Sequence, residues 1–215
     1  MLITIHGRAS SINVQAVMWC AAEIGLEVER LDVGGQFKGN DTPEFLSMNP
    51  MGRVPVLQDG EFSLFESQTI MRYLATRYEA GSLWPAQPEE RAVVDQWMEW
   101  GKTTVSINFI AKIFWQLVRV SRETRDMALV ESGIEEMNTL LDIAEAQITR
   151  NGWLAAEQMT LADISFGTML YRYYTLDFVR GTHTAVSEYY KRLTERPAYR
   201  DQVMISFASL YAPGA

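Results

Sequence analysis

Residues 49–74 read NPMGRVPVLQDGEFSLFESQTIMRYL, and the order of structural signals in this stretch decides the fold. Two short runs, 56–58 and 62–64, have the composition of strands, and Asp59-Gly60 between them readily supplies the positive φ angles of a tight turn. Residues 67–78 then place their apolar side chains at helical spacing. The stretch therefore predicts a β-hairpin followed directly by an amphipathic helix.

Short strands and amphipathic helices also alternate ahead of this stretch. Residues 2–6 predict a first strand and residues 28–33 a second strand. The apolar residues between them follow helical spacing, and Gly25 closes that helix. Residues 34–40 form a glycine-rich loop. The order of elements predicts an α/β first domain.

Residues 83–88, LWPAQP, interrupt this pattern, and everything after them is helical. We therefore divide the chain into a first domain of residues 1–80, a linker at residues 81–88 and an all-helical second domain of residues 89–215. No run of apolar residues approaches the length of a membrane-spanning helix.

Two long periodic stretches of the second domain, 89–120 and 124–150, predict an antiparallel helical pair. The clearest local signal in this half follows in residues 159–164, MTLADI. Thr160 can cap a helix here while Asp163, three residues on, reaches back to it. Apolar residues occupy both positions of a hydrophobic staple around this capping box.

Pro55 stands at the start of a predicted strand. Proline lacks a backbone donor, so it is best placed at a bend, where an X-Pro bond adopts the cis form at modest cost. Such a bend aims the N–H and C=O of Val54 outward, ready to pair with an extended peptide as an added strand does. The alternative is an ordinary turn proline before an edge strand.

Composition limits the classes of partner and the compartment. A net charge of -8 and a pI near 4.9 argue against nucleic acid or an anionic membrane surface as the main partner, because both need a basic face. The single cysteine, Cys20, excludes an internal disulfide framework and fits a reducing compartment. The first residues lack the pattern of a signal peptide. We expect a cytoplasmic protein.

The motifs within residues 49–74 strongly resemble those of the cytosolic glutathione transferases. The likeness covers essentially the whole chain, because the capping box and staple at 159–164 are typical of that family's second domain. Residues 34–40 and the run Ser11-Ile12-Asn13 look most like bacterial members of the serine-type branch. The resemblance implies a thioredoxin-like α/β domain that holds glutathione and an all-α domain that holds a hydrophobic co-substrate.

The same resemblance implies a metal-independent transferase that pairs as a homodimer. Its glutathione site is expected at Val54, Pro55, Glu66 and Ser67. Ser67, at the start of a helix, offers a hydroxyl and backbone N–H groups to a carboxylate, and Glu66 offers the opposite charge to an amine. Together they suit the zwitterionic γ-glutamyl head of glutathione. Simple capping by Ser67 is the alternative.

Lys38 and Arg53 are candidates for binding the glycine carboxylate of glutathione, with solvated surface charge as the alternative for each. Gln36 and Asn40 are weaker candidates for the same role.

The chemistry asked of such an enzyme is ionisation of a thiol whose pKa is ordinarily near ~8.5. Lowering that pKa by two requires roughly 2.7 kcal/mol in favour of the thiolate. One hydrogen bond to an anion supplies about 1.5–3 kcal/mol, and the positive end of a helix up to ~1–2 kcal/mol more. A single hydroxyl at the start of the first helix therefore suffices.

Ser11 matches the thiolate-stabilising hydroxyl of the serine-type branch, with Asn13 as a second donor. Ser10, one residue out of register, remains an alternative, and so does plain helix capping. Related sequences often carry a basic residue where this chain has Gln15, which predicts weaker stabilisation of the thiolate. We interpret Cys20 as an inert core residue.

His6 and His183 have no metal or triad partners at suitable spacing, and we interpret both as structural or surface residues.

An aromatic and polar stripe follows helical spacing in the first helix of the second domain. Three tryptophans on one stripe exceed what a small helical bundle needs, so we expect part of it to line an apolar co-substrate pocket. The resemblance places this helix facing the glutathione thiol. The predicted pocket residues are Trp100, Thr104, Asn108 and Trp115, with Tyr171 and Tyr174 as further candidates.

The sequence is compatible with three functions. The first is an enzyme that activates glutathione for attack on an electrophilic carbon or for reduction of an organic peroxide. The second is a glutathione-dependent disulfide reductase. The third is a non-catalytic module of the same fold. The sequence does not identify the electrophile.

Overall fold

The computed structural model describes residues 3–78 and 80–215. The chain forms two compact units. The first unit comprises Met1–Trp84 and Pro197–Ile205, and the second comprises Pro85–Arg196 and Ser206–Ala215. Residues near the C-terminus therefore return to the first unit before the chain ends in the second.

The elements of the first unit are β1 (Ile3–His6), α1 (Ile12–Ile24), β2 (Val28–Leu31), α2 (Pro43–Met48), β3 (Val56–Asp59), β4 (Phe62–Phe65), α3 (Ser67–Arg77) and α8 (Pro197–Gln202). The four strands form a mixed sheet in the order β2-β1-β3-β4. β1 pairs parallel with β2 and antiparallel with β3, and the predicted hairpin joins β3 to β4. This is the α/β architecture that the sequence predicts.

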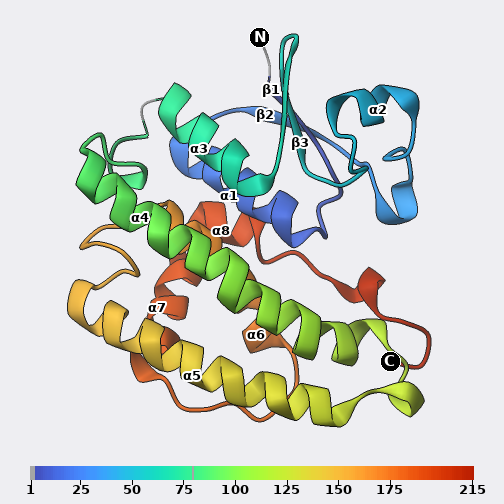
Figure 1. Cartoon of the computed structure of the whole chain (residues 1–215), viewed down its shortest axis with the longest axis vertical. Helices are drawn as coiled ribbons and strands as arrows, with labels where there is room; N and C mark the ends of the chain where they lie inside the picture. Colours follow the sequence, from blue (N-terminus) through green and yellow to red (C-terminus); the bar gives the residue numbers. More distant parts are fainter. Residues whose placement is uncertain (1–2, 79) are drawn as a thin grey trace. The chain divides into compact units, whose positions relative to one another are not determined.

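Helices α1 and α3 lie side by side (Figure 1) and share an apolar core with the sheet. Val17 on α1 and Leu74 on α3 are fully buried, and so is Ile5 on β1. Trp19 of α1 meets Tyr199 of α8 edge to face, with ring centroids 4.7 Å apart. This aromatic contact holds the returning C-terminal segment in the first unit.

Three elements of the first unit differ in detail from the prediction. Regular pairing in the second strand ends at Leu31, two residues before the predicted end at Val33, and Gly34 follows with φ 83°. Helix α2 was not predicted, although Thr42 caps it by accepting a bond from the Phe45 N–H at 3.3 Å. Leu2, the first residue of the predicted first strand, lies outside the described residues.

The elements of the second unit are α4 (Pro88–Trp100), two π-helical segments (Gly101–Ser106 and Phe109–Arg119), α5 (Met127–Asn151), α6 (Leu161–Thr175) and α7 (Thr184–Glu195). The π-helical segments continue the course of α4, and α5 runs back in the opposite direction (Figure 1). The predicted antiparallel pair is therefore present. The α-helical spacing assumed over 89–120 is wrong beyond Trp100.

Two glycines let the helices of this unit approach closely. A Cβ atom at Gly101 would lie 3.3 Å from the backbone N of Phe166 on α6. A Cβ atom at Gly133 on α5 would lie only 2.7 Å from the Cβ of Lys112, a distance that real side chains do not tolerate. Close packing of α5 on the second π-helical segment therefore requires glycine at position 133.

The capping box at the start of α6 is confirmed. The carboxylate of Asp163 accepts bonds from the Thr160 N–H at 2.7 Å, the Leu154 N–H at 2.9 Å and the Tyr189 hydroxyl at 3.0 Å. Burial raises the pKa of Asp163 above its ordinary value, although these donors oppose the shift. Asp163 thus ties the start of α6 to the preceding loop and to α7.

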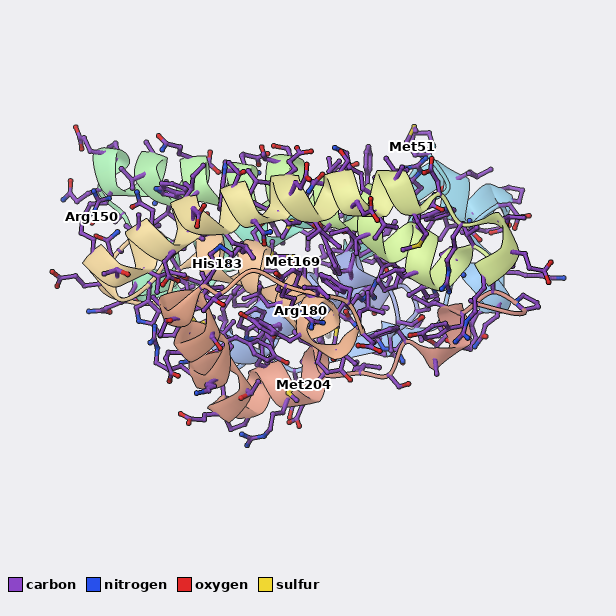
Figure 2. The ribbon with its side chains drawn as sticks, turned by 90° about the horizontal axis from the view of Figure 1, so that it is seen from below. Met51, Arg150, Met169, Arg180, His183 and Met204 are labelled. Carbon is purple, nitrogen blue, oxygen red and sulfur yellow. The ribbon has the colours of Figure 1, made fainter. Side chains whose placement is uncertain are left out.

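The connection from α6 to α7 is fixed by arginine and histidine. Arg180 donates to the C=O of Tyr173 at 2.7 and 2.9 Å and to the C=O of Phe178 at 3.1 Å, near the C-terminal end of α6. The buried His183 lies 3.2 Å from the Asp142 carboxylate on α5. Figure 2 labels both residues on this connection. Of the two roles that the sequence left open for His183, structural or surface, its burial supports the structural one.

Among the described residues, no helix is long and apolar enough to cross a membrane. The same residues contain no group of three or more His, Cys, Asp or Glu side chains that could hold a metal ion.

Candidate active site

Ser11 occupies the N-cap position of α1, at the point where the first strand has led into the helix. Its side chain is nearly buried, with 8% exposed. Within the described part of the chain, its hydroxyl accepts no hydrogen bond from the N–H groups of its own helix. The hydroxyl therefore does not serve the capping role that the sequence left open, and it stays available to a ligand.

Ser10 and Asn13 flank Ser11 on the same turn. Both are half-buried, and both already have an interaction within the protein. Ser11 is thus set apart from its two neighbours by burial and by the unused state of its hydroxyl. The role of each residue toward a sulfur atom remains a prediction.

The Val54–Pro55 peptide bond is cis. Pro55 is buried just before β3, whereas Val54 is half-buried at a bend. Among residues 3–78 and 80–215, neither the N–H nor the C=O of Val54 takes part in a hydrogen bond. A polar backbone unit left unpaired next to a sheet is suited to an extended peptide that pairs as an added strand.

The approach to Val54 is kept open by glycine. A Cβ atom at Gly34 would lie 3.4 Å from Cγ1 of Val54, and one at Gly7 would lie 3.1 Å from its Cβ. At Gly7 the same atom would also lie 2.4 Å from Cγ2 of Val14 on α1. Position 7 therefore has no room for a side chain, and the loop that carries Ser11 can run close to Val54.

Glu66 and Ser67 lie where β4 ends and α3 begins. Glu66 is exposed and has φ 72°, a left-handed conformation that costs a residue other than glycine about 1–3 kcal/mol. Ser67 is the first residue of α3 and is 4% exposed. In the described residues its hydroxyl has no hydrogen-bond partner. The unused hydroxyl and the free N–H groups at a helix start have the chemistry that suits a carboxylate.

Lys38 and Arg53 are both exposed, and they lie on loops that are bonded to each other. The Asn40 amide donates to the Gly52 C=O at 2.7 Å, and the Asn49 amide donates to the Arg53 C=O at 2.7 Å. Asn40 therefore has a structural task. The two cations therefore lie on a connected pair of loops, and Lys38 has a strained φ of 55°.

Arg8 is a residue of this region that the sequence analysis missed. Its side chain packs on the glycine-rich loop. The contact is close at Gly35, where an added Cβ atom would lie 3.2 Å from the Cδ and Nε atoms of Arg8. Its backbone N–H donates to the Val33 C=O at 3.0 Å. The sequence offered only proximity to Ser11 as a signal, and its contact with the loop depends on the fold.

Cys20 and His6 do not belong to the site. Cys20 is fully buried in α1, and burial raises the pKa of its thiol far above the ordinary value. Its Sγ atom lies 4.0 Å from the Met71 C=O. His6 shares a hydrogen bond with the side chain of Gln58 at 3.1 Å. Cys20 is the inert core residue that the sequence predicts.

The predicted co-substrate residues of the second unit face different neighbours. Trp100 is half-buried and its ring lies 6.1 Å from that of Phe166 on α6. The Asn108 amide is buried and donates to the Gly133 C=O at 3.1 Å. Trp115 is 52% exposed. Hydrogen bonding from i to i+5 places more residues in each turn, so side chains at α-helical spacing no longer share one face.

Thr104 is half-buried between these positions. Tyr171 meets Phe207 edge to face at 6.2 Å, and Tyr174 stacks on Tyr190 at 4.4 Å. Burial raises the pKa of Tyr174 to about 12, so this hydroxyl remains protonated at neutral pH. Both tyrosines therefore already have packing roles within the second unit.

Comparison with known proteins agrees with this geometry. Residues 1–76 match the family model described as glutathione S-transferase, N-terminal domain, and residues 95–197 match the corresponding C-terminal domain. Glutathione S-transferase GstB of Escherichia coli K12 is 34% identical over 206 residues, which cover 95% of this chain and 99% of the relative. Glutathione S-transferase 4 of Zea mays is 30% identical over 91% of this chain and 89% of its own length.

A solved structure gives the same result. The crystal structure of the theta class glutathione S-transferase from Xanthomonas axonopodis pv. citri with glutathione bound superimposes with a TM-score of 0.89 at 38% identity. The match covers 95% of this chain and 98% of the other. The two domain matches, the full-length relatives and this structure show that the chain belongs to the glutathione S-transferase family.

Proposed function

We propose that this protein binds glutathione in its first unit and activates the thiol for attack on small hydrophobic electrophiles or organic peroxides. The observation that carries the proposal is a set of polar groups that the described residues leave unused. They are the Ser11 hydroxyl, the Val54 backbone N–H and C=O, and the Ser67 hydroxyl. The Xanthomonas relative, whose crystal structure contains glutathione, supports the assignment.

Each part of the tripeptide has a partner in this proposal. Glu66 and Ser67 bind the amine and carboxylate of the γ-glutamyl head, aided by the N–H groups at the start of α3. Val54, held next to Pro55, pairs with the backbone of the cysteine. Lys38 and Arg53 are the cations proposed for the glycine carboxylate.

Ser11 is the proposed donor to the glutathione sulfur. A hydroxyl that donates to an anion contributes about 1.5–3 kcal/mol, and the start of α1 adds up to ~1–2 kcal/mol. Their sum covers the roughly 2.7 kcal/mol needed to lower the thiol pKa by two. Asn13 is the proposed second donor.

The co-substrate pocket is assigned to α4 and its π-helical continuation. Trp100 and Thr104 are half-buried, and Trp115 is half-exposed, so part of each residue remains accessible. The Asn108 amide donates to the Gly133 C=O of α5. Asn108 is therefore proposed to support the pocket by holding its helix against α5. Residues 1–80 thus serve glutathione and residues 89–215 serve the second substrate, with the linker at 81–88.

One assay separates this function from a disulfide reductase and from a non-catalytic module. Purified protein is supplied with glutathione and, in turn, an aryl halide, an organic peroxide and a small disulfide. We expect turnover with the halide or the peroxide. Turnover with the disulfide alone would favour the reductase. Glutathione binding by calorimetry with no turnover of any of the three would favour the binding module.

The protein is further proposed to act as a two-fold homodimer in the cytoplasm. Family resemblance supports the dimer, and the single buried cysteine is compatible with a reducing compartment. Sedimentation at micromolar concentration should give about twice the chain mass of 24.5 kDa. A single species at the mass of one chain would rule the dimer out.

A further inference from the structure

The loop from Gly7 to Ser11 is held by hydrogen bonds from both sides. The Gly7 C=O accepts from Nη1 of Arg30 at 2.8 Å, and the Arg8 C=O accepts from the Ser11 N–H at 3.1 Å. The C=O of Ala9 accepts from Nε2 of Gln15 at 3.0 Å. Three successive carbonyls before the serine pair are therefore fixed, and one of them depends on a side chain of α1.

Gln15 is linked to the loop at two points. Its backbone N–H donates to the Ser11 C=O at 2.9 Å, as the first turn of α1 requires. Its side chain extends back along the helix to Ala9, on the other side of Ser10. The two bonds therefore fix the chain on both sides of Ser10, at Ala9 and at Ser11.

The side chain of Gln15 is buried in spite of its polarity. Only 2% of the residue is exposed, and its Oε1 atom has no hydrogen-bond partner among the described residues. A buried acceptor without a partner is unfavourable, so an apolar side chain would suit the core better at this position. The structure uses only the NH2 group of this amide, which donates to the Ala9 C=O. An apolar residue has no such donor.

We propose that Gln15 is a positioning residue, which fixes Ala9 so that the Ser11 hydroxyl is directed at the glutathione sulfur. The inference rests on the function proposed above, and it gives Gln15 a task that needs a donor but no charge. A lysine could donate the same bond and would add a positive charge beside the thiolate. Gln15 orients the loop that carries the Ser11 hydroxyl, and the thiolate charge is stabilised by that hydroxyl and by the start of α1.

The test compares Gln15→Leu with Gln15→Lys and with the control Gln58→Leu. Gln58 also donates from its side-chain amide to a backbone carbonyl of the first unit, that of Gly60 at 3.3 Å. We expect Gln15→Leu to lower kcat at neutral pH about tenfold with little change in the glutathione KM, and to raise the pKa of the bound thiol. Gln15→Lys, which keeps a donor at this position, should have a kcat close to that of wild type. Gln58→Leu should leave the pH profile unchanged.

A double-mutant cycle with Ser11→Ala separates positioning from a general loss of stability. If Gln15 acts through Ser11, Gln15→Leu has little further effect on kcat in the Ser11→Ala background. Gln15→Met serves as the second variant without a donor if the leucine variant does not fold. Additive losses in the cycle, or a Gln15→Leu pH profile that matches wild type, would overturn the inference. Wild-type protein that does not bind glutathione would instead overturn the proposed function.

Discussion

Glutathione affinity should fall about a hundredfold or more in the Glu66→Ala, Ser67→Ala double variant. The change removes a carboxylate that pairs with the ligand amine and a hydroxyl that donates to the ligand carboxylate, and each of these hydrogen bonds to a charged group is worth about 1.5–3 kcal/mol. A combined loss of about 3 kcal/mol corresponds to roughly a hundredfold in the dissociation constant. Isothermal titration calorimetry with glutathione measures the effect directly.

The matched control for this experiment is Glu61→Ala, Ser63→Ala, which removes the same side chains from the adjacent β3–β4 hairpin. It should retain wild-type affinity. Glu66→Gly adds a second comparison, because glycine adopts φ 72° without strain. This variant should lose affinity without losing thermal stability. Wild-type affinity in a folded double variant would disprove the assignment of the γ-glutamyl head.

Ser11→Ala should lower turnover near neutral pH about tenfold or more and leave glutathione affinity nearly unchanged. Loss of the hydroxyl removes a hydrogen bond to the thiolate and raises the pKa of the bound thiol by about one to two pH units. Below that pKa the rate follows the thiolate fraction, so the deficit is largest at low pH and shrinks as the pH rises. The pH dependence of kcat and the ultraviolet absorbance of the bound thiolate measure the two effects.

Ser10→Ala is the control for Ser11, because it removes the same atom from the neighbouring residue. It should leave the pH profile unchanged, and Asn13→Ala should have a partial effect. If Ser11→Ala kept the wild-type rate and profile, the role would pass to Ser10 or Asn13. Wild-type behaviour in all three variants would leave only the helix dipole and backbone N–H groups as the source of activation.

Local sequence signals were sufficient for most of the first unit and for the start of α6 in the second unit. Asp59-Gly60 specified the hairpin, Gly25 specified the end of α1, and Thr160 with Asp163 specified the start of α6. Each of these features depends on residues a few positions apart, whose preferred φ angles or hydrogen bonds are local. The region around Glu66 and Ser67 was found in the same way, since a strand followed by a helix start is also a local pattern.

Features that depend on distant residues could not be read from the sequence. The return of Pro197–Ile205 to the first unit rests on the contact between Trp19 and Tyr199, which are far apart along the chain. The contact of Arg8 with Gly35 and the fixing of Ala9 by Gln15 likewise exist only once the loops have folded. The sequence marked Gln15 as a missing charge, and the structure shows a buried hydrogen-bond donor.

The sequence by itself determined the β3–β4 hairpin and the helix α3 that follows it. It also indicated a bend at Val54–Pro55 and placed a carboxylate and a hydroxyl, Glu66 and Ser67, at the start of α3. Only the tertiary structure decided which polar groups stay unused, because a donor or acceptor is available to a ligand only if no other part of the chain reaches it. It also decided that helical spacing breaks down beyond Trp100. There the close approach of α6 at Gly101 and of α5 at Gly133 accompanies π-helical turns, and Asn108 is turned toward α5 while Trp115 remains exposed.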